Sequence, residues 1–202
     1  MNDKARIKVY VGYAWQKVND CKSDERWTEI KKYFKRTNDY LEEHYGVGVD
    51  FRRLRASHGR FIWESVRDKI SGADVLIFDV ASLPVGAVAN GKEIAYRNFN
   101  ANVLVEVGAA LANPNVRMLL LCPKSLKSKI PTDISGICYS SYVDIMGKNG
   151  INRKYEDKWG ILPMYRSMVA DVIESRGLAA VEAEEDIAQD VIEESYKSEV
   201  VK

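Results

Sequence analysis

The sequence predicts a three-layer α/β/α protein built on a five-stranded parallel sheet. Segments with a strand pattern alternate with segments of helical spacing over residues 7–176, and such alternation implies parallel strands joined by helical crossovers. The segments Asp74–Val80 and Val116–Cys122 are almost continuously apolar, which is typical of strands in a sheet covered on both faces. Five strands in this arrangement favour the flavodoxin-like order, in which ligands bind at the carboxyl edge of the sheet.

The first half of the chain is expected to hold two strands and two helices before the strand Asp74–Val80. Alternating β-branched residues predict the first strand, and apolar residues three and four apart predict both helices. The expected elements are a strand at Ile7–Val11, a helix from Asp24 to Tyr45, a strand at Val47–Phe51, a basic loop with Arg52, Arg53, Arg55 and His58, and a helix from Phe61 to Ile70.

The second half begins with a segment, Ala81–Asn100, that we expect to be a long loop. A loop of about 20 residues exceeds the usual connection, and such loops often act as lids. A helix centred on Glu106 follows. The remaining expected elements are the strand Val116–Cys122, a loop at Pro123–Gly136, a strand at Ile137–Val143, a loop at Gly147–Asp157 and a helix from Leu162 to Arg176.

The helix of residues 101–112 contains a single charged side chain. All its other residues are apolar or small, except Asn102. A helix without a polar face is expected to be buried on all sides, and a buried carboxylate is costly unless it is paired or protonated. We therefore expect Glu106 either to carry a function or to pair with an arginine such as Arg97 or Arg117.

Composition excludes several classes of function. The net charge of +1 gives no reason to expect direct binding to nucleic acid or to an acidic membrane. The chain has no apolar run of about 20 residues and no signal-peptide pattern, so we expect a cytoplasmic protein. Its three scattered cysteines indicate reduced thiols, and its two histidines argue against a His-rich metal centre. We expect no bound metal.

Residues 179–202 differ from the rest of the chain in charge. They contain eight acidic and two basic residues, a net charge of −6, and the overall +1 then leaves +7 on residues 1–178. We therefore divide the chain into a domain at 1–178 and an acidic C-terminal helix or tail at 179–202. This segment is expected either to be solvated or to mediate self-association or binding to a partner.

Three segments carry a recognisable pattern: Ile7-Lys-Val-Tyr-Val-Gly-Tyr-Ala14, Ile70-Ser-Gly-Ala-Asp-Val-Leu-Ile-Phe-Asp79 and Asn102-Val-Leu-Val-Glu-Val-Gly-Ala-Ala-Leu111. Together they resemble the superfamily that joins TIR domains with nucleoside 2-deoxyribosyltransferases. The stretch Ile130-Pro-Thr-Asp-Ile-Ser-Gly-Ile-Cys-Tyr139 is similar to bacterial TIR-like nucleotide-binding domains. The chain departs from animal TIR enzymes, which have a Trp-Cys pair where it has Asn102 and Val103.

The resemblance implies cleavage of an N-glycosidic bond with Glu106 as the catalytic carboxylate. Such cleavage develops positive charge on the sugar, which a nearby carboxylate stabilises or captures. The first loop of the cleft is expected to let backbone N–H groups approach a phosphate, and Trp15 can stack on a base or belong to the core. Asp79 can bind sugar hydroxyls or merely cap its loop. The expected substrate-binding residues are Gly12, Tyr13, Ala14, Trp15, Asp79 and Asn102.

The resemblance also implies a substrate and a setting. We expect NAD as the substrate, nicotinamide plus ADP-ribose or a cyclic ADP-ribose as products, and no separate cofactor. Bacterial relatives commonly serve anti-phage defence, so a homo-oligomer or a partner sensor or effector protein is expected. Two alternatives stay open: a nucleoside or nucleotide 2-deoxyribosyltransferase or hydrolase, and a non-catalytic TIR-like module that binds a nucleotide or a partner.

Overall fold

The computed structural model describes residues 6–14, 23–55, 62–82, 85–89, 92–130, 138–147, 150–155 and 161–178. The main sheet contains β1 (Arg6–Tyr13), β2 (Gly48–Arg53), β3 (Val75–Asp79), β6 (Arg117–Pro123), β7 (Cys138–Gly147) and β8 (Gly150–Tyr155). Their order is β2-β1-β3-β6-β7-β8. The first five strands run parallel to their neighbours, and β8 is antiparallel to β7. The predicted five-stranded parallel sheet of flavodoxin-like order is therefore confirmed, with one added edge strand.

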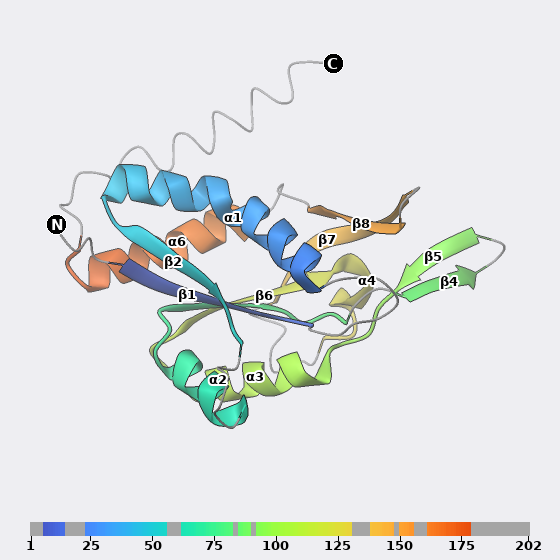
Figure 1. Ribbon diagram of the computed structural model, residues 1–202, viewed down its shortest axis with the longest axis horizontal. Helices are drawn as coiled ribbons and strands as arrows, with labels where there is room; N and C mark the ends of the chain where they lie inside the picture. The colour runs from blue at the N-terminus through green and yellow to red at the C-terminus, as the bar shows by residue number, and fades with distance from the viewer. Residues whose placement is uncertain are drawn as a thin grey trace, which may run out of the picture.

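Helices cover both faces of the sheet, as Figure 1 shows. α1 (Ser23–Tyr45) and α6 (Ile161–Ser175) pack on one face, and α2 (Ile62–Ser71) and α3 (Ala101–Leu111) pack on the other. Because side chains alternate across a strand, β3 contributes side chains to the core on each face of the sheet. Val75 and Ile77 join the core under α1 and α6, whereas Leu76 and Phe78 join the core under α2 and α3.

The strand register brings three of the predicted site residues, Gly12, Tyr13 and Asp79, to the carboxyl edge. Gly12 of β1 lies opposite Phe78 of β3, and Tyr13 lies opposite Asp79. On its other side Asp79 lies opposite Leu121 of β6. Because all these strands are parallel, their last residues reach the same edge of the sheet, where ligands bind in folds of this kind.

The expectation that Ala81–Asn100 is a long loop is wrong. It contains a β-hairpin of β4 (Val85–Ala89) and β5 (Lys92–Tyr96), which forms its own two-stranded antiparallel sheet. At its base Ala81 forms a bridge with Phe99, and Ser82 N–H donates to the Asn98 carbonyl at 2.6 Å. Figure 1 shows the hairpin extending away from the main sheet.

Three further boundaries also differ from the expectation. The predicted loop at Gly147–Asp157 contains β8, which pairs with a longer β7 through Tyr142↔Tyr155. The predicted loop at Pro123–Gly136 begins with the one-turn helix α4 (Lys124–Lys127). Arg52 and Arg53 belong to β2 and not to a loop. β2 and β8 are the two edge strands of the main sheet, and their polar residues concealed the strand pattern in the sequence.

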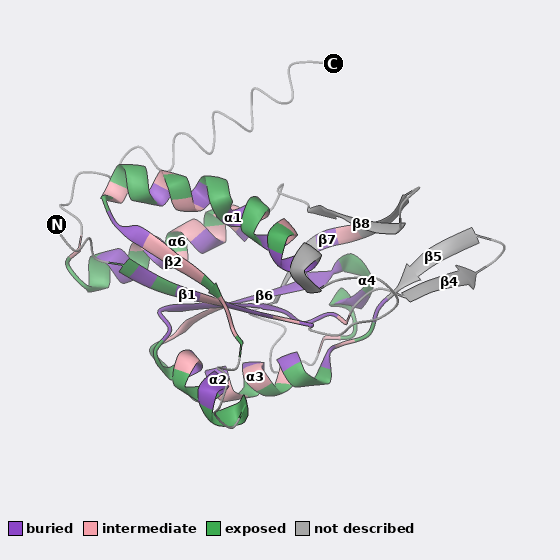
Figure 2. Ribbon diagram, viewed as in Figure 1, coloured by how far each residue is buried: buried purple, intermediate pink, exposed green. Residues whose placement is uncertain are grey.

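The expectation that the Glu106 helix is buried on all sides is wrong. Its buried residues are Val103, Val107 and Ala110, while Val105 is 58% and Leu111 is 51% exposed. Figure 2 shows both buried and exposed residues along α3. In the described structure α3 packs on the sheet and against α2, and its outer side, with Val105 and Leu111, meets solvent despite its apolar sequence.

None of the helices in the described residues is long and apolar enough to cross a lipid bilayer. The acidic segment 179–202, which we separated as a C-terminal helix or tail, lies outside the described residues. The stretch 131–137, which carries part of the Ile130–Tyr139 resemblance, lies outside them as well.

Candidate functional site

The Glu106 carboxylate lies against the end of β1. A Cβ atom placed on Gly12 would meet Glu106 Oε2 at 2.8 Å and Phe78 Cδ1 at 2.5 Å. Both distances are too short for a real carbon atom. Gly12 therefore leaves the space that the carboxylate and the Phe78 ring occupy, and the structure brings two of the predicted site residues, Gly12 and Glu106, together at the carboxyl edge.

The surroundings of Glu106 disfavour its charged form. Burial raises the pKa of the Glu106 carboxyl from 4.5 to about 7, because a carboxylate loses hydration when it is taken from water. Glu106 lies on the same face of the sheet as the apolar core under α2 and α3. That core contains Phe78, Val103 and Val107. At neutral pH the group is therefore divided between its protonated and its ionised form.

Among the described residues Glu106 has no ion-pair or hydrogen-bond partner. The two arginines that we considered as partners bind elsewhere. Arg97 donates to the Ser82 carbonyl at 2.8 Å, and Arg117 lies 3.8 Å from Asp171. A partly buried carboxylate without a compensating cation lowers stability, and such groups are frequent at functional sites.

Asp79 lies at the same edge but on the opposite face of the sheet. By alternation along β3 it follows Val75 and Ile77 toward α1. There it is 2% exposed, forms an ion pair with Arg26 of α1 and accepts a hydrogen bond from the Tyr142 hydroxyl at 2.8 Å. These contacts give Asp79 a structural role, and they separate it from the face on which Glu106 lies.

Two buried arginines flank the Tyr142 ring in this cluster. The guanidinium carbons of Arg26 and Arg97 lie 5.3 and 5.4 Å from the ring centroid, and both residues are less than 5% exposed. Cation–π contacts of this kind gain strength when they are removed from water. The cluster of Arg26, Asp79, Arg97 and Tyr142 thus ties α1, β3, the base of the hairpin and β7 together.

The other predicted substrate-binding residues are spread over different surroundings. Tyr13 stacks on Trp27, with ring centroids 6.3 Å apart, and Ala14 is buried. Asn102 is exposed in the first turn of α3. Trp15 lies outside the described residues. The capping residue of α3 is Asn100, whose side chain accepts from Val103 N–H at 3.1 Å.

The basic residues of β2 have partners of their own. Arg52 pairs with Asp50 at 2.5 Å on the exposed side of β2, and the Arg53 guanidinium lies 5.5 Å from the Trp27 ring. His58, which we considered as a general acid, lies outside the described residues.

Sequence reasoning missed three residues at this edge: Arg26, Phe78 and Tyr142. A signal existed for Arg26, because it lies four residues before the core residue Ile30 and therefore on the inward stripe of α1. Phe78 was recognised only as part of an apolar strand, and Tyr142 only as part of a short one. Their partners lie far apart in sequence, so spacing alone does not reveal them.

Within the residues that the structure describes, no cluster of three or more His, Cys, Asp or Glu side chains could hold a metal ion. Comparison with models of known protein families gives no match for this chain, and comparison with curated proteins gives none either.

Proposed function

We propose that the protein cleaves the N-glycosidic bond of a nucleotide, with NAD as its substrate and Glu106 as the catalytic carboxylate. The observation that carries this proposal is the partly buried Glu106 against Gly12, without a cation or hydrogen-bond donor among the described residues. Maintaining such a group costs stability. Such destabilising groups are found most often at functional sites, where the carboxylate acts on a ligand.

The proposed reaction uses Glu106 in its ionised form. When the bond between nicotinamide and ribose breaks, its electron pair leaves with the pyridinium ring, which becomes neutral nicotinamide. The ribose carbon becomes an oxocarbenium-like centre, which the nearby carboxylate stabilises. Attack by water, with loss of its proton, then gives ADP-ribose. A hydroxyl of the same substrate in place of water gives a cyclic product.

The chemistry of the leaving group favours NAD over a deoxynucleoside. A purine or pyrimidine base leaves readily only when it is protonated, so its cleavage needs a general acid beside the carboxylate. Nicotinamide leaves from a cation and needs none. In the described structure the groups that crowd Gly12 are Phe78 and Glu106, and Asp79 is engaged on the opposite face with Arg26 and Tyr142. A site with one carboxylate and no general acid beside it therefore suits NAD better than a deoxynucleoside.

Incubation of the chain with separate substrates tests the proposal. NAD, NADP and a set of deoxynucleosides are each incubated with concentrated protein, and the products are identified by mass spectrometry. Free nicotinamide with ADP-ribose or its cyclic form supports the proposal. Free base from deoxynucleosides alone would favour the transferase or hydrolase instead. Release of neither product, at any protein concentration, would favour a binding module.

A further inference from the structure

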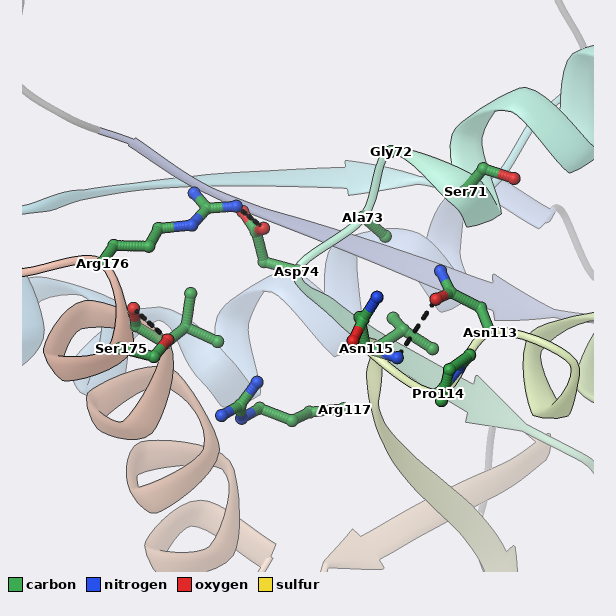
Figure 3. A pocket seen from close by; sticks show the side chains of 12 residues that line it. Ser71, Gly72, Ala73, Asp74, Asn113, Pro114, Asn115, Arg117, Ser175 and Arg176 are labelled. Atoms are coloured by element: carbon green, nitrogen blue, oxygen red, sulfur yellow. Dashed lines mark hydrogen bonds and ion pairs between the residues drawn. The ribbon is translucent and has the colours of Figure 1, made fainter.

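A hollow of about 750 Å³ opens at the amino edge of the sheet, opposite the edge that carries Glu106. It forms where α2, α3 and α6 end and where β3 and β6 begin. Figure 3 shows polar side chains around it, including Asp74, Asn113, Asn115, Arg117, Ser175 and Arg176.

The one acid that lines this hollow, Asp74, forms an ion pair with one of its two arginines, Arg176. The Asp74 carboxylate accepts the Lys8 backbone N–H at 2.8 Å and pairs with Arg176 (Figure 3). Asp74 is thereby satisfied, with its side chain 6% exposed. A guanidinium has five N–H donors, and the Arg176 side chain is 44% exposed, so Arg176, which lines the hollow, keeps N–H donors that Asp74 does not occupy.

The second arginine is weakly paired. Arg117 Nε lies 3.8 Å from a carboxylate oxygen of Asp171, whose side chain is 57% exposed. An exposed pair at that separation contributes little. The charged residues that line the hollow are Asp74, Arg117 and Arg176, with a net charge of +1, and the exposed Asp171 beside Arg117 partly offsets it. Of the lining charges, Arg117 and Arg176 are those that reach solvent.

The described chain ends close to this hollow. Gly177 has φ +61°, and Leu178 N–H donates to the Ile173 carbonyl at 3.0 Å, which closes α6 in a Schellman-type turn. The segment that follows has a net charge of −6. Its first four acids, Glu182, Glu184, Glu185 and Asp186, lie within eight residues of Leu178, an extended reach of roughly 13–26 Å.

We propose that the amino-edge hollow binds the acidic start of the C-terminal segment, with carboxylates of residues 182–186 on Arg117 and Arg176. Charge complementarity and the short connection from Leu178 support this occupant over a separate ligand. Binding there also keeps the segment away from Glu106. The five residues of β3 separate the two edges by about 17 Å, more than the Debye length of about 8 Å at physiological salt. An anionic nucleotide at the carboxyl edge is then little repelled.

Zero-length carbodiimide cross-linking of the full chain tests the contact. The Arg117→Lys variant keeps the charge and provides an amine that can be joined to a neighbouring carboxylate. Arg36→Lys, on the exposed side of α1, is the matched control, and a cross-link from position 117 to Asp171 shows that the reagent reaches the site. We expect cross-links from position 117 to residues 182–186 at several-fold higher yield than from position 36. They should be independent of protein concentration and suppressed in about 1 M salt, where the Debye length is about 3 Å.

Cleavage by a Glu-specific protease provides a second measurement that needs no new amine. In the full-length chain, Arg117→Gln should speed cleavage after Glu182, Glu184 and Glu185 several-fold relative to Arg36→Gln, with unchanged circular dichroism for both. The proposal is overturned if position 117 is joined to Asp171 alone, if position 36 reaches the segment equally well, or if the cross-links join two molecules. Equal cleavage rates in the two Gln variants also overturn it.

Discussion

At the scale of single residues, the raised pKa of the Glu106 carboxyl makes the stability of the folded chain depend on pH. Between about pH 4.5 and pH 7 the folded state binds more protons at this group than the unfolded state, so its contribution to stability falls as pH rises through that window. Glu106→Gln removes the titration. We expect the variant to be more stable than wild type at pH 8, by about 1–3 kcal/mol after allowing for solvent screening, and nearly equal at pH 4.5. Urea unfolding at both pH values measures this; a variant less stable at pH 8 would indicate a structural role.

A substitution at Gly12 tests the close approach of the Glu106 carboxylate to β1. Because a Cβ would lie 2.5 Å from Phe78 and 2.8 Å from Glu106, Gly12→Ala must displace one of them. We expect a loss of about 1–3 kcal/mol of stability, as for other overpacked sites, and a loss of most of the turnover. Gly108→Ala on α3 is the matched control, since its Cβ would meet nothing within 4 Å. It should gain up to about 1 kcal/mol and keep its activity. Equal activity of the two variants would contradict this geometry.

At the scale of the elements, the Asp79 cluster joins α1, β3 and β7. Removal of one partner of a buried ion pair costs about 3–5 kcal/mol, so we expect Asp79→Ala to lose up to that amount, because the buried Arg26 keeps its pair with the partly exposed Glu29 at 3.0 Å but loses its buried partner. Tyr142→Phe should lose about 1 kcal/mol with its hydrogen bond. Chemical denaturation measures both. If Asp79 instead bound the substrate, Asp79→Ala would raise KM while leaving stability close to that of wild type.

The success of the sequence interpretation differed between elements for physical reasons. Buried strands such as β3 were predicted because a strand covered on both faces must be apolar throughout. The hairpin of β4 and β5 was missed although Asn90-Gly91 is a typical two-residue turn sequence, because Val-Gly-Ala-Val-Ala shows no alternation of polarity. β8 was missed because an edge strand carries polar residues such as Asn152, Arg153 and Lys154.

The candidate site was predictable only in part. Glu106 could be found because a charge in an apolar helix is anomalous whatever its neighbours are. The face on which Asp79 lies depends on the strand register, and its partners Arg26 and Tyr142 are 53 and 63 residues away in sequence. The apolar pattern of α3 predicted burial, but the number of neighbours that cover a helix is a property of the whole fold.

At the scale of the whole molecule, the fold places an ionisable carboxylate at the carboxyl edge and the Arg117–Arg176 hollow at the other. Since the proposed reaction needs the ionised form of Glu106, kcat/KM for NAD should rise with pH through about 7 and level off above pH 8. The pH profile of nicotinamide release measures this. A rate that falls over the same range would assign Glu106 as a proton donor.

The central claim is that the Glu106 carboxylate performs the cleavage, and the most direct test is nicotinamide release from NAD by wild type, Glu106→Gln and Glu64→Gln. Glu64 lies on the exposed side of α2, so its variant loses a carboxylate of the same kind without touching the site. We expect release by wild type and Glu64→Gln at equal rates, and a rate lower by about 10²-fold or more for folded Glu106→Gln. Equal nicotinamide release by all three proteins would contradict the account.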